Sequence, residues 1–392
     1  MKKFLIFLGL ILSFNCAFAL EESDLKDFGI AKYAVLETTS DFSPLRYAKD
    51  ENSGRFSHLK KNVTLYADCE SEKFYRVDLG LGEHFWIEKK FAQVQAVIPQ
   101  KRIQKLSEIK FDEDKNKIKI FIPMDIQNAY SFRENPDGLD FYLYDVKYSK
   151  TSTKIKNRHH AFKISSTNNV LNIKYTTPAI FGYDVLRLDD GLSVEINKIP
   201  KIKSKKPLSK IKVAIDAGHG GEETGVCAFG HKEKDVNLQI SKRLKKALRK
   251  KGAKVYMTRK KDKFSGLYDR VTFAQQKEAQ ILISIHQNSL PNPKDVAEKH
   301  GVGVYYYNKQ AKPLAQSIQE SLLKQTGFRD DGVNYASFAL TRPTNPVSVL
   351  VECGYLIDKN EMQKLTNKKF QKELAQALGE GVENYLRYLI VY

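Results

Sequence analysis

The chain has 392 residues, a formal net charge of +19 and an apolar fraction of 42%. This length allows two or three domains, and the apolar fraction lets each bury a core, which excludes a chain too small or too polar to fold. The positive charge favours an anionic polymer as partner, such as cell wall, membrane surface or nucleic acid, although a solvated lysine-rich surface explains it equally well.

The first 19 residues have the three parts of a secretory signal. Lys2 and Lys3 form a basic start, residues 4–14 are apolar, and residues 17–19 read Ala-Phe-Ala, a cleavage-site pattern. The apolar run is too short to span a bilayer comfortably, and no later run is long enough to do so. A lipoprotein signal that uses Cys16 is the alternative. The sequence therefore predicts export to the periplasm, cell wall or medium, which weighs against nucleic acid as a partner.

Three cysteines follow this segment, at Cys69, Cys227 and Cys353. Three scattered thiols do not make a disulfide framework, so buried free thiols are expected. A Cys227–Cys353 disulfide is the alternative, because both residues flank the candidate site described below.

Residues 26–98 are expected to form a small all-β module. Short β-branched and aromatic runs alternate there with polar turns. The layout, which ends on Gly-Leu-Gly-Glu-His-Phe-Trp-Ile at residues 80–87, resembles a bacterial SH3-like wall-associated module. Trp86, the only tryptophan, is expected in the core or in a ligand groove.

Residues 99–199 are expected to form a second β-rich module. Asn135-Pro136-Asp137-Gly138 is a strong turn signal, and Asp190-Gly191 predicts a hairpin. The position of this module weakly resembles that of the AMIN modules that precede wall amidases. His159 and His160 are interpreted as a solvated pair. Residues 200–210, rich in lysine and proline, are predicted to be a solvated basic linker that could contact an anionic polymer.

Residues 211–392 change character, because apolar runs of strand length now alternate with helical patterns. This alternation predicts an α/β domain, an open twisted and mostly parallel sheet flanked by helices, preceded by the two small all-β modules. Strands are expected at residues 213–216, 254–258, 281–285, 302–306 and 347–351. Helices are expected around residues 236–248 and at 268–278, 313–325 and 370–388.

Four polar residues fall at the ends of these elements. His219 follows the first strand, Glu233 precedes the next helix, and His286 and Glu352 follow two later strands. Sites in open α/β sheets gather at the carboxyl ends of the strands, so the four residues are expected to converge at one edge. Taken singly, each has a plain interpretation as a surface or capping residue.

Two histidines and one glutamate are a typical ligand set of catalytic Zn²⁺, with a coordination position left for water. Glu352 would then carry the proton from water to the leaving amine. Asp216 is expected either to orient His219 or to cap the turn. His231 is a competing ligand candidate, only two residues from Glu233.

The motifs D-A-G-H-G-G, K-E-K-D-V-N-L, T-R, S-I-H-Q-N-S and V-L-V-E-C-G-Y-L resemble the zinc-dependent N-acetylmuramoyl-L-alanine amidases of the Amidase_3 class. This resemblance covers residues 211–392 and implies His219, Glu233 and His286 as zinc ligands, with Glu352 as the catalytic glutamate. It implies hydrolysis of the amide between N-acetylmuramic acid and L-alanine in peptidoglycan. The β modules would bind the wall, an anionic wall polymer or an activator protein.

Two other functions stay open from the sequence: an inactive wall-binding scaffold that keeps the fold, and a zinc peptidase that cuts another wall bond. Some members of the class insert an autoinhibitory helix after the strand of His286. Residues 290–301 are too short for such a helix with its connections, so the metal edge is expected to be open.

Overall fold

The computed structural model describes residues 24–149, 152–156, 161–289 and 300–390. The signal segment with Cys16, the His159–His160 pair and most of the segment expected to leave the metal edge open lie outside the described residues. The secretory signal, the solvated histidine pair and the open metal edge therefore stay predictions. Within the described ranges, no helix has both the length and the apolar character needed to cross a membrane.

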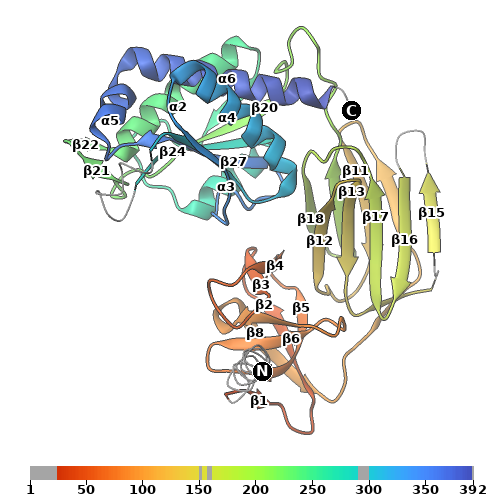
Figure 1. Cartoon of the computed structure of the whole chain (residues 1–392). Coiled ribbons are helices and arrows are strands. Elements are labelled where there is room, and N and C mark those ends of the chain that lie inside the picture. Colours follow the sequence, from red (N-terminus) through yellow and green to blue (C-terminus); the bar gives the residue numbers. More distant parts are fainter. Residues whose placement is uncertain (1–23, 150–151, 157–160, 290–299, 391–392) are drawn as a thin grey trace, which may run out of the picture. The chain divides into compact units, whose positions relative to one another are not determined.

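The described chain forms two compact units (Figure 1). The first unit takes in residues up to 110 together with 121–177 and 187–193, and the second takes in 111–120, 178–186 and the chain from 194 onward. The first unit is built of strands, whereas the second is mixed α/β. The domain ranges 26–98, 99–199 and 211–392 remain predictions from the sequence.

One sheet of the first unit contains the strands from Lys26 to Ile98. Its order is β4-β3-β7-β6-β5-β2-β8, and β1 pairs with β5. Strand β2 alternates half-buried and buried residues, the pattern of a sheet with one face on the core. The strands are β1 (Lys26–Asp27), β2 (Tyr33–Thr38), β3 (Ser43–Arg46), β4 (Arg55–Leu59), β5 (Thr64–Glu70), β6 (Phe74–Asp78), β7 (His84–Glu88) and β8 (Ala92–Ile98).

Trp86 lies in β7, where its side chain is half-buried. The Nζ atom of Lys49 lies 5.9 Å from the centroid of the Trp86 ring, which is the geometry of a cation–π contact. Trp86 is therefore neither a fully buried core residue nor an open aromatic surface.

Three further sheets follow in the chain. Their orders are β10-β11-β19-β18, β12-β13-β17-β16-β15 and the parallel pair β14-β9. The turn expected at residues 135–138 joins β12 to β13, with Asn135 paired to Gly138. The strands are β9 (Gln104–Leu106), β10 (Lys110–Glu113), β11 (Lys117–Pro123), β12 (Tyr130–Asn135), β13 (Gly138–Leu143), β14 (Val146–Tyr148), β15 (Ser152–Lys156), β16 (Ala161–Thr167), β17 (Val170–Thr176), β18 (Tyr183–Leu188) and β19 (Gly191–Asn197).

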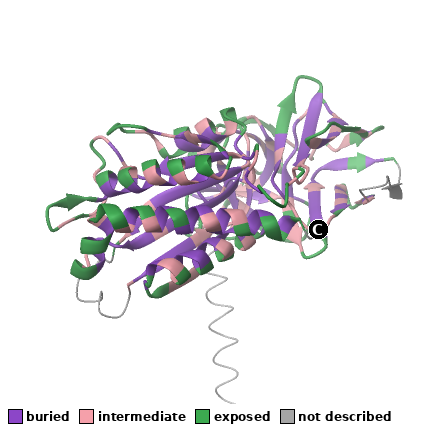
Figure 2. Cartoon of the chain, turned by 90° about the horizontal axis from the view of Figure 1, so that it is seen from above, coloured by how far each residue is buried: buried purple, intermediate pink, exposed green. Residues whose placement is uncertain are grey.

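A six-stranded sheet forms the centre of the second unit, with the order β23-β20-β24-β27-β25-β26. Its pairs are parallel except β25 with β27. The inner strands β20, β24 and β27 are mostly buried, and each contains an apolar run, as expected for strands with both faces covered (Figure 2). The strands are β20 (Lys212–Ala217), β23 (Lys254–Met257), β24 (Ile281–Asn288), β25 (Val302–Tyr306), β26 (Asp330–Tyr335) and β27 (Val347–Tyr355), and β21 (Cys227–Ala228) and β22 (His231–Lys232) form a separate hairpin.

Helix α6 packs against both α2 and α4, and these helices pack on the sheet (Figure 1). Gly381 of α6 makes the close approach possible, because a Cβ atom there would lie 2.5 Å from the Cα atom of Ile318 in α4. The helices are α2 (Glu233–Lys250), α3 (Leu267–Gln276), α4 (Lys312–Thr326), α5 (Lys359–Thr366) and α6 (Lys368–Leu389), with short 3-10 turns at Lys89–Phe91 and Lys309–Ala311.

Several sequence predictions need correction. The segment 200–210 is not wholly solvated, because Leu208 is fully buried in the core of the second unit. Strand β26 was not predicted, since Asp330 and Asp331 make its sequence polar, and α5 was also missed. Residues His286 and Glu352 lie inside β24 and β27, which extend beyond the apolar runs, rather than after them.

Candidate metal centre

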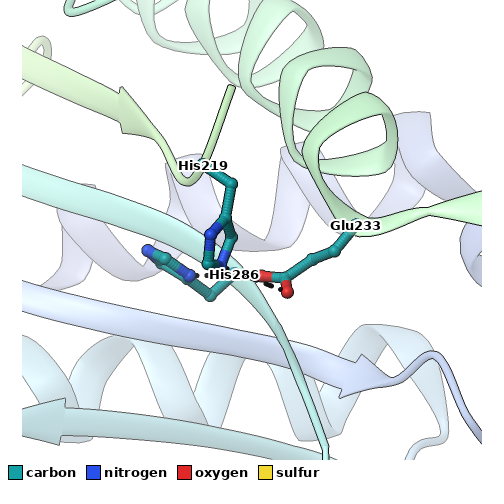
Figure 3. A group of neighbouring side chains, drawn as sticks. All are labelled: His219, Glu233 and His286. Atoms are coloured by element: carbon teal, nitrogen blue, oxygen red, sulfur yellow. Dashed lines mark hydrogen bonds and ion pairs between the residues drawn. The ribbon is translucent and has the colours of Figure 1, made fainter. Parts of the chain in front are cut away.

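Three of the predicted site residues converge at one edge of the sheet of the second unit (Figure 3). His219 lies just after β20, Glu233 is the first residue of α2, and His286 lies near the end of β24. One ligand atom from each side chain lies within 4.8 Å of the other two. The sequence separates these residues widely, so the sheet and the start of α2 bring them together.

The Glu233 carboxylate lies between the two imidazoles. Its Oε2 is 3.2 Å from Nε2 of His219, and its Oε1 is 3.2 Å from Nδ1 of His286. Burial opposes ionisation of Glu233, but the hydrogen bonds from the two histidines outweigh it and lower its pKa below the ordinary value. Burial by itself would lower the pKa of His286. The hydrogen bond to Glu233 and the charges of the nearby carboxylates outweigh burial, so the pKa of His286 is raised.

Three protein donors fix the orientation of the Glu233 carboxylate. The side-chain amide of Asn237 and the backbone N–H of Gln287 donate to Oε1, at 3.0 and 3.1 Å. The backbone N–H of Val226 donates to Oε2 at 3.0 Å. Such outer hydrogen bonds orient a ligand and hold it in its charged form.

Glycines let the backbone approach these side chains. A Cβ atom on Gly218 would lie 2.3 Å from Cε1 of His286, and one on Gly225 would lie 2.3 Å from Oε2 of Glu233. His219 itself has a φ of 59°, in the left-handed region that residues other than glycine rarely adopt. The turn therefore holds the His219 imidazole in a constrained backbone conformation.

The donor set fits a zinc ion. It offers two imidazole nitrogens and one carboxylate, the three-ligand set of several catalytic zinc sites. The Glu233 side chain is 3% exposed, whereas those of His286 and His219 are 16% and 29% exposed. The carboxylate is thus shielded and the imidazoles reach solvent, so a metal held here would be accessible to a substrate.

Glu352 lies beside this group. It pairs with His286 across the parallel strands β24 and β27, and it is half-buried. Its Oε2 atom is buried and has no hydrogen-bond partner among the described residues. Burial raises the pKa of Glu352 to about 7, and the charges of Glu233 and Asp331 act in the same direction while His286 opposes them. A carboxyl group with such a pKa can both accept and donate a proton near neutral pH.

Asp216 plays neither of the roles expected from the sequence. Its fully buried carboxylate accepts hydrogen bonds from Thr258 at 2.6 Å, Ser284 at 2.7 Å and Arg270 at 2.9 Å. Arg270 in turn donates to the backbone carbonyl of His219 at 3.1 Å. Among the described residues, Asp216 is linked by hydrogen bonds to the His219 turn through Arg270.

His231 is exposed in the β21–β22 hairpin and does not belong to the group of close ligand atoms. The three cysteines that the structure describes are free: Cys353 is buried, Cys69 is half-buried and Cys227 is exposed. The expectation that all three thiols are buried is thus wrong for Cys227, and the alternative Cys227–Cys353 disulfide is not formed.

Several residues around the centre were not assigned a role from the sequence. Asn237 lies four residues after Glu233 on α2, a spacing that could have indicated their contact. Asn288 of β24 and Tyr355 of β27, on the strands that carry His286 and Glu352, form a hydrogen-bonded cluster with Asp331 of β26. Asp331 belongs to the unpredicted edge strand β26, so no sequence pattern linked it to the centre.

Comparison with known proteins gives consistent matches over the second unit. A family model described as "N-acetylmuramoyl-L-alanine amidase" matches residues 213–384. The chain is 33% identical over 190 residues to the uncharacterized protein YqiI of Bacillus subtilis, covering 47% of this chain and 90% of that protein. It is 33% identical over 187 residues to the N-acetylmuramoyl-L-alanine amidase LytC of Bacillus subtilis, but this match spans only 37% of LytC.

Among solved structures, an N-acetylmuramoyl-L-alanine amidase from Clostridium difficile 630 is 35% identical to the matched region, with a TM-score of 0.44. That match covers 46% of this chain and 98% of the other. The residues matched by the family model lie wholly within the second unit.

Proposed function

Because the chain belongs to the Amidase_3 family of N-acetylmuramoyl-L-alanine amidases, we propose that it is a zinc-dependent peptidoglycan hydrolase. The bond cut is the amide between the lactyl group of N-acetylmuramic acid and L-alanine of the stem peptide. The observation that carries the proposal is the meeting of His219, Glu233 and His286, with Glu352 beside them, whose Oε2 atom has no hydrogen-bond partner among the described residues.

His219, Glu233 and His286 would hold the zinc ion. The ion supplies Lewis acidity, which lowers the pKa of water and polarises the scissile carbonyl. Glu233 contributes a negative charge that Asn237 and the backbone of Gln287 and Val226 keep in place. The two imidazoles are partly exposed, so water and substrate could reach an ion held here from that side.

Glu352 would move the proton. It accepts a proton from the attacking water and passes it to the amide nitrogen, so that L-alanine leaves as an amine and the lactyl group becomes a carboxylate. The free Oε2 atom supports this role, because a buried acceptor without a partner can be satisfied by water or substrate. A pKa of about 7 allows both halves of the transfer.

The first unit would bring the enzyme to its substrate after export. Its β modules, which resemble SH3-like and AMIN modules in sequence, would bind peptidoglycan, an anionic wall polymer or an activator protein. The net charge of +19 fits an anionic polymer.

Mass analysis of digested peptidoglycan tests the proposal. Purified protein with zinc should release intact stem peptides that begin with L-alanine and leave glycan with free lactyl carboxyl groups. Fragments cut within the stem peptide would instead identify a peptidase, and unchanged peptidoglycan would favour an inactive wall-binding scaffold. Chelation should abolish release until zinc is restored, and release that survives chelation contradicts the zinc mechanism.

A further inference from the structure

Two of the three proposed ligands lie on separate backbone segments that the sheet does not connect directly. His219 follows β20, whereas Glu233 begins α2 after an intervening hairpin. A metal site needs these segments at a fixed spacing. The Thr258-Arg259 motif lies just after β23 and has no role in the proposed chemistry, yet Arg259 is only 4% exposed.

The Arg259 guanidinium contacts both segments. Its Nε donates to the carbonyl of Ala217 at 2.8 Å, and its Nη2 donates to Gly218 at 3.0 Å. The same Nη2 donates to the carbonyl of Lys234 at 2.7 Å. Gly218 directly precedes His219 and Lys234 directly follows Glu233, so one planar group spans the neighbours of both ligands.

The turn also rests on the aliphatic part of this side chain. A Cβ atom on Gly220 would lie 3.0 Å from both Cδ and Nε of Arg259. His219, between Gly218 and Gly220, has a φ of 59°. Such a backbone conformation is unfavourable for a residue other than glycine and persists only where the surroundings impose it. Arg259 is one of the groups that impose it.

Arg270 and Asn237 have different parts in the same region. Arg270 donates to the carbonyls of Ala217 and His219 and to the Asp216 carboxylate. These bonds support the His219 turn and do not reach the Glu233 segment. Asn237 joins the Gly218 carbonyl to the Glu233 carboxylate, at 3.2 and 3.0 Å. Of the two arginines, Arg259 is therefore the one whose hydrogen bonds reach both ligand segments.

We propose that Arg259 is a positioning residue that sets the spacing of His219 and Glu233 for metal binding. It does not touch the metal or the substrate and acts through the backbone on either side of the ligands. This inference rests on the proposed zinc site. Lysine cannot replace the guanidinium, because a single ammonium group lacks the fixed fork that serves three carbonyls in different directions.

The test compares zinc affinity with stability in Arg259→Lys. Affinity is measured by competition with a chromophoric chelator, and the Tm of the full chain is measured without metal and with saturating zinc. We expect a 10- to 100-fold loss of zinc affinity, the usual effect of removing an outer support of a metal ligand. At a fixed, limiting zinc concentration, the rise in Tm on adding zinc should shrink accordingly.

Gln371→Leu is the matched control for a purely structural effect. Gln371 is fully buried and donates to Leu365 and Gln239, away from both ligand segments. This variant should lower the metal-free Tm and keep wild-type zinc affinity. Arg270→Lys should weaken zinc binding less than Arg259→Lys, because Arg270 supports only the His219 side.

Wild-type zinc affinity in a destabilised Arg259→Lys variant would overturn the inference and leave the proposed function intact. Absence of zinc binding by the wild-type protein would contradict the proposed function itself. If Arg259→Lys does not fold, Arg259→Gln, which keeps two N–H donors, is measured in the same way. If neither variant folds even with saturating zinc, Arg259 is a residue of the fold and the inference is wrong.

Discussion

His286 and Glu352 face each other in register on the parallel strands β24 and β27. One is a proposed zinc ligand and the other the proposed proton carrier, so a single strand pair fixes the distance between the metal and the acid–base group. Strands position side chains more rigidly than loops do, which favours a precise reaction geometry. Two glutamates with different proposed roles thus lie at one centre, and the same substitution should affect them differently.

Glu352→Gln should keep the metal and lose turnover. The amide has nearly the same shape as the carboxyl group but cannot accept and release the proton, so kcat should fall by about 100-fold to 10,000-fold. Zinc content and affinity should stay at the wild-type level. Peptide release from muropeptides and metal analysis measure the two effects, and wild-type turnover would show that Glu352 is not the proton carrier.

Glu233→Gln should have the opposite pattern. It removes the only negative ligand from the group, and the remaining donors from Asn237, Gln287 and Val226 would face a neutral amide oxygen. We expect at least a 100-fold loss of zinc affinity together with loss of activity, measured by chelator competition. Equal zinc affinity in this variant and in Glu352→Gln would remove Glu233 from the ligand set.

Zinc should also stabilise the protein, because it binds the folded centre and not the dispersed ligands. At a free zinc concentration about a thousand times the Kd, the folded state should gain about 4 kcal/mol. Differential scanning calorimetry with zinc and with chelator measures this gain. His286→Ala should abolish it, while Glu352→Gln should show it in full.

Gly381→Ala should destabilise the second unit without a direct effect on the site. The added Cβ would lie 2.5 Å from the Cα atom of Ile318, and backbone cannot yield as a flexible side chain can. Helices α6 and α4 would have to move apart, at a cost of about 1–3 kcal/mol. Gly379→Ala is the control, since its nearest contact would be an ordinary 3.7 Å to Ala247. Equal thermal stability of the two variants would contradict the expected effect.

The stability of the first unit should depend on the protonation of Asp145. This residue is 5% exposed, and burial raises its pKa to about 6 although Lys101 opposes the shift. An unfolded Asp145 loses its proton near its ordinary pKa of 3.8, so the folded state holds the proton more tightly. Asp145 therefore lowers stability as the pH rises from about 4 to above 6, by roughly 3 kcal/mol in total.

Asp145→Asn should remove this pH dependence of stability. The free energy of unfolding of the variant should therefore rise relative to that of the wild type as the pH rises from 4 to 7. Denaturant unfolding followed by the fluorescence of Trp86, the only tryptophan, reports on the first unit. Asp78→Asn provides a control of opposite sign. Burial opposes ionisation of Asp78, but the hydrogen bonds from Gly80 and Lys101 outweigh burial and lower the pKa of Asp78. Asp78 therefore stabilises the fold at neutral pH, and this stabilisation is lost in acid. A pH-independent difference between Asp145→Asn and wild type would contradict the expectation.

The sequence by itself determined most of the elements of the second unit, though not β21, β22, β26 or α5, and it grouped the three residues that meet at the sheet edge. Short apolar runs predict β20, β24 and β27, because strands covered on both faces are apolar on both, and parallel strands bring their carboxyl ends to one side. His219, Glu233 and His286 could therefore be grouped from their positions alone, although β24 and β27 run further than the apolar residues indicated.

Only the tertiary structure decided how these residues are held. The fork of Arg259, the partners of Asp216 and the edge strand with Asp331 depend on contacts between residues about 25 to 70 positions apart in the chain. The hydrogen-bond partners of a polar side chain have no periodic signature in sequence, so a buried arginine and an exposed one look alike there. The sequence grouped the proposed ligands because apolar runs and helical patterns mark where strands and helices begin and end, and the fold decided what fixes their spacing.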